Sequence, residues 1–169
     1  EFDAAKLDEA TRRGLEKAIA NGRALLAAAS QTPMPDVRNG WIFPLGLADY
    51  GKDYLLRANV VFGGYANRPE ESTYAARTVD GAGELMSGAR RYRLHFAPGE
   101  TPPAGAFWSL IAYDLKTRNL IDNPLRRYSI GDRTPDLKKN PDGSLDIHIQ
   151  KEQPVSGNSN WLPVGEGPF

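Results

Sequence analysis

The chain begins with apolar residues spaced three and four positions apart. This spacing runs from residue 7 to residue 29, with charged residues between the apolar ones, and it predicts an amphipathic helix. Residues 30–40 contain Pro33 and Pro35 and predict a loop. A second helix is expected over residues 48–62, because the apolar positions there share one broad face and no proline interrupts them.

After Pro69 the pattern changes to the period of two that is typical of strands. Residues 90–96 alternate cleanly, and residues 106–114 are nearly all apolar, which predicts a central strand covered on both faces. The turn Asn140-Pro141-Asp142-Gly143 predicts a hairpin, since Asp-Gly suits the positive φ of a tight turn. Its second arm, residues 144–150, should point Leu145, Ile147 and Ile149 inward and Asp146, His148 and Gln150 outward. Further strands are expected at residues 72–79, 128–130 and 137–139.

These elements predict a mainly β protein. We expect an antiparallel, jelly-roll-like β-sandwich with one or two N-terminal α-helices. Residues 1–40 would form a helix and linker that lead into the sandwich of residues 41–169.

Composition excludes several functional classes. The 169 residues include 21 Lys+Arg and 21 Asp+Glu, and a net charge of zero argues against a nucleic-acid binder that works through bulk charge. The absence of cysteine excludes disulfides, thiolate metal sites and a cysteine nucleophile. No apolar run approaches the ~20 residues of a membrane span. We expect no metal, no cofactor and no nucleic-acid partner.

Three groups of residues carry candidate chemistry. The densest polar segment runs from Asp122 to Arg133. Its arginine guanidinium groups could bind a carboxylate, a sulfate or a sugar; the alternative is a structural turn held by Arg–Asp pairs. Aromatic residues with polar tips suit sugar stacking, and among them Trp161 is expected to be exposed and Trp108 to lie in the core. Glu70, Glu71 and Asp80 suit acid–base chemistry, or simply a solvated loop. His95 and His148 are expected to face solvent.

Several segments together resemble the DUF1214 family over residues 41–169. Residues 47–58, LADYGKDYLLRA, are similar to its "LGxYGxDYLxRA" segment. Further similar segments are residues 66–71, 92–96, 102–103, 107–110, 113–114, 123–133, 142–145 and 160–163.

The resemblance implies a jelly-roll β-sandwich and no established reaction. It also implies a periplasmic or cell-envelope location, and an N-terminal DUF1254 domain to which residues 7–29 would form the linker helix. The family usually continues beyond the "GPF" of residues 167–169 with another strand, so the resemblance implies a chain that lacks its last strand and leaves a sheet edge open.

Three functions from different classes fit these residues. The first is a binding module for a glycan or a small anionic ligand, in which the contacts are Arg57, Tyr74, Asn123, Arg126, Tyr128, Asn160 and Trp161. The second is a hydrolase in which Glu71, Asp122 or Asp132 activates water and Arg57 or Arg126 steadies an oxyanion. The third is a structural half-domain that packs on a DUF1254-like partner domain or on a copy of itself.

Overall fold

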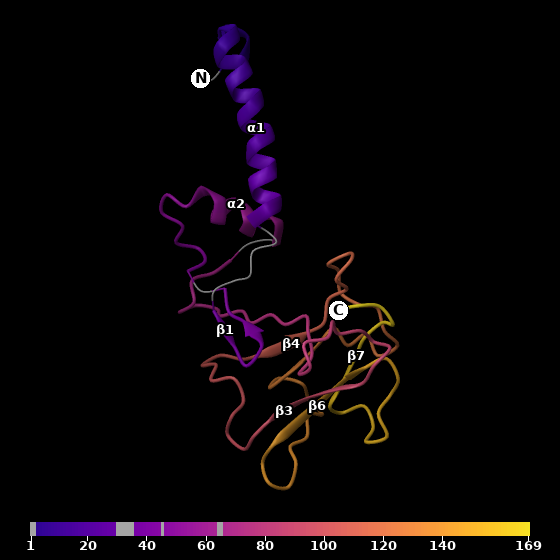
Figure 1. Cartoon of the computed structure of the whole chain (residues 1–169). Helices are drawn as coiled ribbons and strands as arrows, with labels where there is room; N and C mark the ends of the chain where they lie inside the picture. The colour runs from indigo at the N-terminus through magenta and orange to yellow at the C-terminus, as the bar shows by residue number, and fades with distance from the viewer. Residues whose placement is uncertain (1–2, 30–35, 45, 64–65) are drawn as a thin grey trace. The chain divides into compact units, whose positions relative to one another are not determined.

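The chain is divided into two compact units, Glu1–Arg77 and Thr78–Phe169, in a computed structural model (Figure 1). The structure describes residues 3–29, 36–44, 46–63 and 66–169. Each unit has its own secondary structure. The described helices lie in the first unit, and the second unit is built from strands and turns.

The first two helices of the chain, the short 3-10 helix η1 (Ala4–Lys6) and α1 (Glu9–Ala29), begin at the aspartate caps Asp3 and Asp8. Before α1, Asp8 accepts hydrogen bonds from the Thr11 amide at 2.9 Å and the Thr11 hydroxyl at 2.7 Å. These bonds satisfy a free N–H of the first turn and lower the pKa of Asp8. Helix α1 confirms the helix predicted over residues 7–29.

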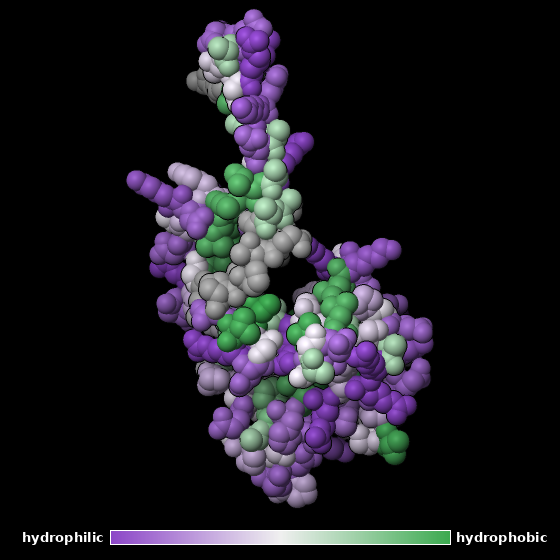
Figure 2. Space-filling model, viewed as in Figure 1, coloured by the Kyte–Doolittle hydropathy of each residue, from purple (hydrophilic) through white to green (hydrophobic). Residues whose placement is uncertain are grey.

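The second helix is shorter than predicted. α2 covers Tyr54–Gly63, and it begins at Asp53, whose carboxylate accepts the Leu56 amide at 2.9 Å. The expected helical start at residue 48 was wrong: Ala48 and Gly51 have positive φ (72° and 49°), which interrupts any helix through them. The C-terminal part of α1 packs against α2, where Figure 2 shows apolar surface beside the mainly polar face of α1.

A small hairpin replaces part of the predicted loop at residues 30–40. Strands β1 (Val37–Arg38) and β2 (Trp41–Ile42) pair antiparallel across Asn39-Gly40, both of which have positive φ, as a type I′ turn requires. Arg77 donates from Nη1 to the Asn39 carbonyl at 2.7 Å. The predicted strand 72–79 was wrong, because only isolated bridges form there, at Ala76 and Val79.

A three-stranded mixed sheet forms the main layer of the second unit. β6 (Leu145–Gln150) is central, antiparallel to β3 (Tyr92–Phe96) and parallel to β7 (Trp161–Pro163). The strands predicted at residues 90–96 and 144–150 are confirmed. The expectation of purely antiparallel pairing was wrong, since the chain crosses over between residues 150 and 161 and brings β7 alongside β6 in the same direction.

A separate two-stranded ribbon also belongs to the second unit. β4 (Ser109–Ile111) and β5 (Ser129–Gly131) pair antiparallel. The prediction that this segment is covered on both faces was wrong, because Leu110 is turned toward the core while Ser109 and Ile111 are exposed. The turn at residues 140–143 is confirmed by the bond from the Gly143 amide to the Asn140 carbonyl, at 2.9 Å, but residues 137–139 form no strand.

One apolar core includes residues from both the three-stranded sheet and the two-stranded ribbon. Ile130 of β5, Leu145 and Ile147 of β6 and Leu162 of β7 are at most 1% exposed. Half-buried side chains from β3 and β4 pack against them. Phe169 is also buried, with its ring edge-on to Tyr92 at 5.7 Å between centroids. The described part of the chain thus has seven short strands and two α-helices, with the strands in antiparallel and mixed sheets that do not close into a barrel.

Candidate functional site

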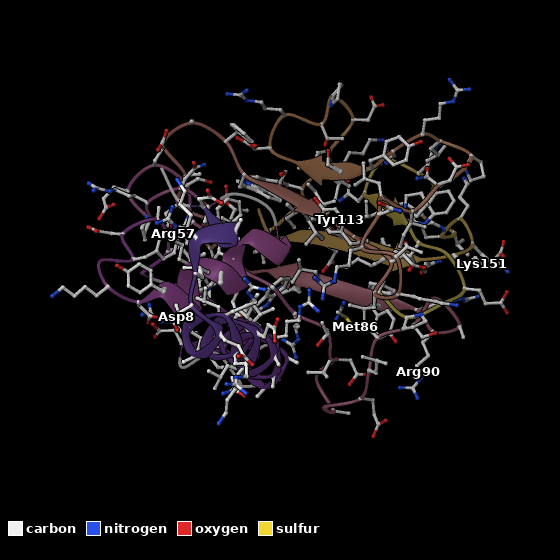
Figure 3. All side chains as sticks on the ribbon, turned by 90° about the horizontal axis from the view of Figure 1, so that it is seen from above. Asp8, Arg57, Met86, Arg90, Tyr113 and Lys151 are labelled. Atoms are coloured by element: carbon white, nitrogen blue, oxygen red, sulfur yellow. The ribbon has the colours of Figure 1, made fainter. Side chains whose placement is uncertain are left out.

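A surface pocket of about 210 Å³ lies where β3 begins and β6 ends. The strand register explains this location. Tyr92 pairs with Ile149, so Arg91, just before β3, and Lys151, just after β6, come to the same end of the sheet. Figure 3 shows Arg90 and Lys151 at the same end of this unit. The charged residues that line the pocket are Arg90, Arg91, Lys151, Glu152 and Glu166.

The wall of the pocket depends on a close backbone approach. A Cβ atom on Gly88 would lie 1.6 Å from the Gly165 carbonyl oxygen, so only glycine fits there. Hydrogen bonds hold the two segments together: the Gly88 amide donates to the Gly167 carbonyl at 3.1 Å, and the Ser87 hydroxyl donates to the Glu166 carbonyl at 3.0 Å. This contact places Glu166 opposite the end of β6.

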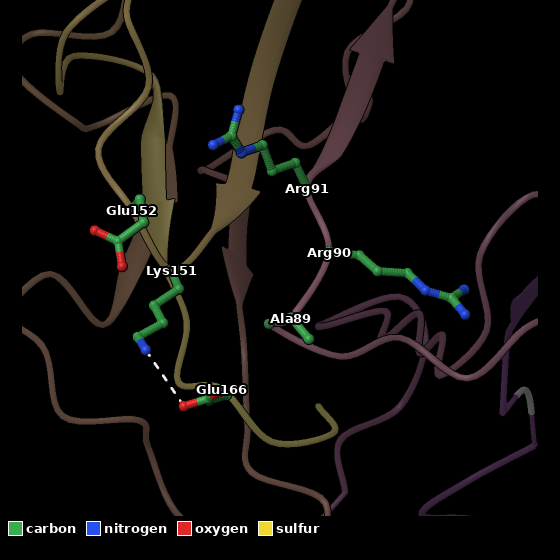
Figure 4. Close-up of a pocket in the computed structure, with 7 residues that line it drawn as sticks. Ala89, Arg90, Arg91, Lys151, Glu152 and Glu166 are labelled. Carbon is green, nitrogen blue, oxygen red and sulfur yellow. Dashed lines mark hydrogen bonds and ion pairs between the residues drawn. The ribbon is translucent and has the colours of Figure 1, made fainter.

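Only some of the five charged side chains of the pocket form ion pairs. Arg90 pairs with Asp80 at 3.6 Å, and Lys151 pairs with Glu166 at 3.3 Å. Figure 4 shows Lys151 and Glu166 pointing toward each other while Arg90 points away from them. Within the described residues, the side chains of Arg91 and Glu152 make no hydrogen bond or ion pair. The pocket therefore offers one free cation and one free carboxylate.

A polar network also lies on the outer face of β3 and β6. His95 lies directly across from Asp146, and its Nδ1 is 2.7 Å from the Asp146 carboxylate. Asn140 donates to the other carboxylate oxygen at 3.0 Å, and Arg93 lies 3.8 Å away. The His95 and Asn140 hydrogen bonds hold the pKa of Asp146 below its usual value of 3.8. His95 and His148 lie on this outer face, as predicted.

The predicted polar segment forms a structural turn. Asn123 donates from Nδ2 to the carbonyls of Ile121 and Arg127, and its side-chain oxygen accepts the Arg127 amide, all within 3.0–3.1 Å. Arg126 has φ +49° and an exposed side chain. Tyr128 donates its hydroxyl to Asp122 at 3.3 Å; partial burial, and then the Asp122 charge, raise the pKa of Tyr128.

The predicted Arg–Asp network was wrong. Arg127 instead points Nη1 at the carbonyls of Asn158, Ser159 and Trp161 and so joins two loops. Asp132 accepts the Trp108 amide at 3.0 Å, which fixes the entry into β4. Arg127 and Asp132 therefore contact backbone groups of distant segments rather than one another.

Of two further predicted contact residues, Trp161 is buried and Asn160 is half-buried. Trp161 is 5% exposed and donates from Nε1 to the Gln150 carbonyl at 2.8 Å, so the prediction that it is exposed was wrong. Asn160 uses its amide fully, since it accepts from the Lys138 amide and donates to the carbonyls of Lys138 and Asp146. Gln150, expected to face outward, is 6% exposed. The cause is β7, which covers this edge of β6.

The remaining predicted residues belong to the first unit. Arg57 and Glu71 are exposed, and Tyr74 is 46% exposed with its hydroxyl accepting from Asn67 at 3.1 Å. Over the described ranges, no three His, Asp or Glu side chains gather as a metal site would require. In the same ranges, neither α-helix has the length and apolar character that crossing a membrane demands.

The pocket was not predicted, although part of its signal is present. Arg91 was recognised only as an outward position of a strand, and Lys151 follows the strand of residues 144–150. Opposite charges at Arg93 or His95 and at Asp146 could have indicated that these two strands pair. The approach of Gly88 to Gly165 spans 77 positions in the sequence and leaves no local pattern.

Comparison with known proteins gives a family and solved structures that are similar to the chain. Residues 71–169 match the family described as "Protein of unknown function (DUF1214)". The crystal structure of the VPA0106 protein from Vibrio parahaemolyticus is similar to the chain, with a TM-score of 0.60 and 26% identity. The match covers 99% of this chain and 40% of that one, so the chain spans well under half the length of this relative. None of the curated proteins matches.

Proposed function

Because the chain belongs to the DUF1214 family, whose function is unknown, we propose from its geometry that the Thr78–Phe169 unit is a binding module for a small anionic ligand. The observation that carries the proposal is the pocket at the start of β3, where the Arg91 guanidinium is exposed and free of an ion-pair partner within the described residues. A guanidinium presents parallel N–H donors that match a carboxylate.

A small ion suits this site better than a glycan does. The volume of about 210 Å³ lies below the 300–1,000 Å³ that is typical of sites for drug-sized ligands. Sugar binding was expected to use the face of Trp161, but that ring is buried. The hydrolase alternative has little support, since Asp122 and Asp132 are already engaged in hydrogen bonds and Glu71 belongs to the first unit.

The test is a titration with propionate in which NMR monitors the amide signals of residues 88–91 and 151–152. We expect saturable shifts at these amides in the wild-type chain, and at least a tenfold weaker affinity in Arg91→Ala, which removes the free fork. Arg126→Ala is the matched control, because Arg126 is an exposed arginine of the same unit outside the pocket. If Arg126→Ala weakens binding and Arg91→Ala does not, the ligand binds at the 122–128 turn and the proposed location is wrong.

A second proposal concerns a partner. Residues 9–21 of α1 are all exposed, including Leu15 and Ile19, and the Vibrio relative has a much longer chain. Exposed apolar positions on an amphipathic helix suit packing on another domain. We propose that a DUF1254-like domain covers them, and hydrogen exchange of the α1 amides is the measurement that tests it. A jelly-roll arrangement of the second unit and an envelope location are further proposals, both based on the family resemblance.

A further inference from the structure

The pocket contains acidic as well as basic side chains, and this limits what it can bind. Glu152 and Glu166 line the same space of about 210 Å³ as Arg90, Arg91 and Lys151. A compact dianion such as phosphate or sulfate would be attracted by Arg91 but repelled by the two carboxylates at close range. A ligand that carries one negative and one positive group meets no such conflict.

The internal ion pairs show which charges are available. Arg90 is held by Asp80 at 3.6 Å and Lys151 by Glu166 at 3.3 Å, so binding to either would compete with an existing partner. Arg91 and Glu152 have no side-chain partner within the described residues. In Figure 4 the Arg91 side chain extends toward β6, whose end carries Lys151 and Glu152.

We infer that the pocket binds a zwitterionic amino-carboxylate, of which a free α-amino acid is the simplest kind. The ligand carboxylate accepts hydrogen bonds from the Arg91 guanidinium, and the ligand ammonium donates to the Glu152 carboxylate. Each unpaired charge of the pocket then gains a partner of opposite sign, and both existing ion pairs stay intact. The inference rests on the proposed function, because it assigns the ligand class of the same site.

Three small molecules of one skeleton separate the possibilities in the full chain. Alanine carries both charges, propionate lacks the ammonium, and ethylammonium lacks the carboxylate. We expect alanine to shift the amides of residues 88–91 and 151–152 at concentrations at least tenfold lower than propionate requires, and ethylammonium to bind more weakly still. Propionate binding as tightly as alanine would overturn the inference and leave the proposed anion site in place.

The variant Glu152→Gln tests the ammonium contact directly. It keeps the size of the side chain and removes its charge, so we expect alanine to bind about tenfold more weakly and propionate to bind equally or more tightly. Glu100→Gln, an exposed glutamate outside the pocket, is the control and should change neither affinity. Tighter binding of both ligands in Glu152→Gln would contradict the inference. Binding of none of the three ligands to wild type would contradict both the inference and the proposed function.

Discussion

The Asp146 carboxylate lies between β3 and the turn at residues 140–143. It accepts from His95 at 2.7 Å and from Asn140 at 3.0 Å, while Arg93 lies 3.8 Å away. Asp142 supports the same turn by accepting the hydroxyl and the amide of Ser144, and these bonds lower the pKa of Asp142. Hydrogen bonds to a charged carboxylate favour its ionised form. The network should therefore stabilise the fold only while Asp146 is ionised.

This gives a pH-dependent prediction for Asp146→Asn. The folded-state pKa of Asp146 is lowered, chiefly by the His95 hydrogen bond and then by that of Asn140, so its stabilisation is present above pH 3.8 and is lost as pH falls through the lowered pKa. At pH 7 we expect the free energy of unfolding of the variant to be about 1 kcal/mol lower than that of wild type, so that it unfolds at a lower urea concentration. This value allows for the partial exposure of Asp146 to solvent. The difference should shrink steadily below pH 3.8.

The matched control for this prediction is Asp136→Asn. Asp136 is exposed and makes no hydrogen bond or ion pair within the described residues, so its variant should match wild type at every pH. Urea midpoints of the three proteins from pH 7 down to pH 2 give the answer. A difference for Asp146→Asn that stays constant over this range would mean that its charge contributes nothing.

At the scale of elements, the sequence predicts those strands whose two faces differ. Tyr92, Leu94 and Phe96 face the core and Arg93 and His95 face solvent, as their alternation indicates. The segment around β4 is nearly all apolar and has no regular alternation, so the pattern could not show that only one face is covered. The aspartate cap of α2 was not recognised, and the positive φ of Ala48 has no sequence signature.

Strand partners are harder to predict than strands. The parallel pairing of β7 with β6 buries Gln150 and Trp161, two side chains that were expected outside. Their polar atoms are satisfied by backbone groups, Gln150 by the Glu152 carbonyl at 2.7 Å and Trp161 by the Gln150 carbonyl at 2.8 Å. Burial of this kind depends on contacts between distant segments, which local periodicity does not contain.

Arg127 is predicted to hold the approach to β7 in place. Its Nη1 points at three carbonyls of the 158–161 segment, and hydrogen bonds from a charged donor to such groups are worth about 1.5–3 kcal/mol. We expect Arg127→Ala to lower the free energy of unfolding by about 2 kcal/mol. It should also speed hydrogen exchange at the amides of residues 160–162 more than at those of β3.

The neighbouring arginine supplies the comparison for this element. Arg126→Ala removes the same chemical group from an exposed position and should leave both measurements near wild type. Arg127→Lys keeps the charge but not the planar fork, so it should fall between wild type and Arg127→Ala. Equal effects of Arg126→Ala and Arg127→Ala would show that the three carbonyl contacts do not stabilise β7.

At the scale of the whole molecule, the two units differ in how their elements are stabilised. Every buried residue of the main apolar core lies within Thr78–Phe169, the unit that contains the proposed pocket. The family match to residues 71–169 covers this unit completely. In contrast, α1 buries little of its surface: residues 9–21 are all exposed, and only its C-terminal part packs on α2.

This contrast predicts a large difference in hydrogen exchange. Most helices depend on packing of an apolar face for their stability, so the amides of residues 9–21 should exchange rapidly in this chain alone, while those of β6 exchange only on unfolding of the second unit. A DUF1254-like domain that covers Leu15 and Ile19 should slow the α1 amides and leave β6 unchanged. The variant Leu15→Glu/Ile19→Glu should unfold at the wild-type urea midpoint but lose this protection. If α1 exchanges as slowly as β6 in the monomeric chain, the helix needs no partner and the docking proposal is wrong.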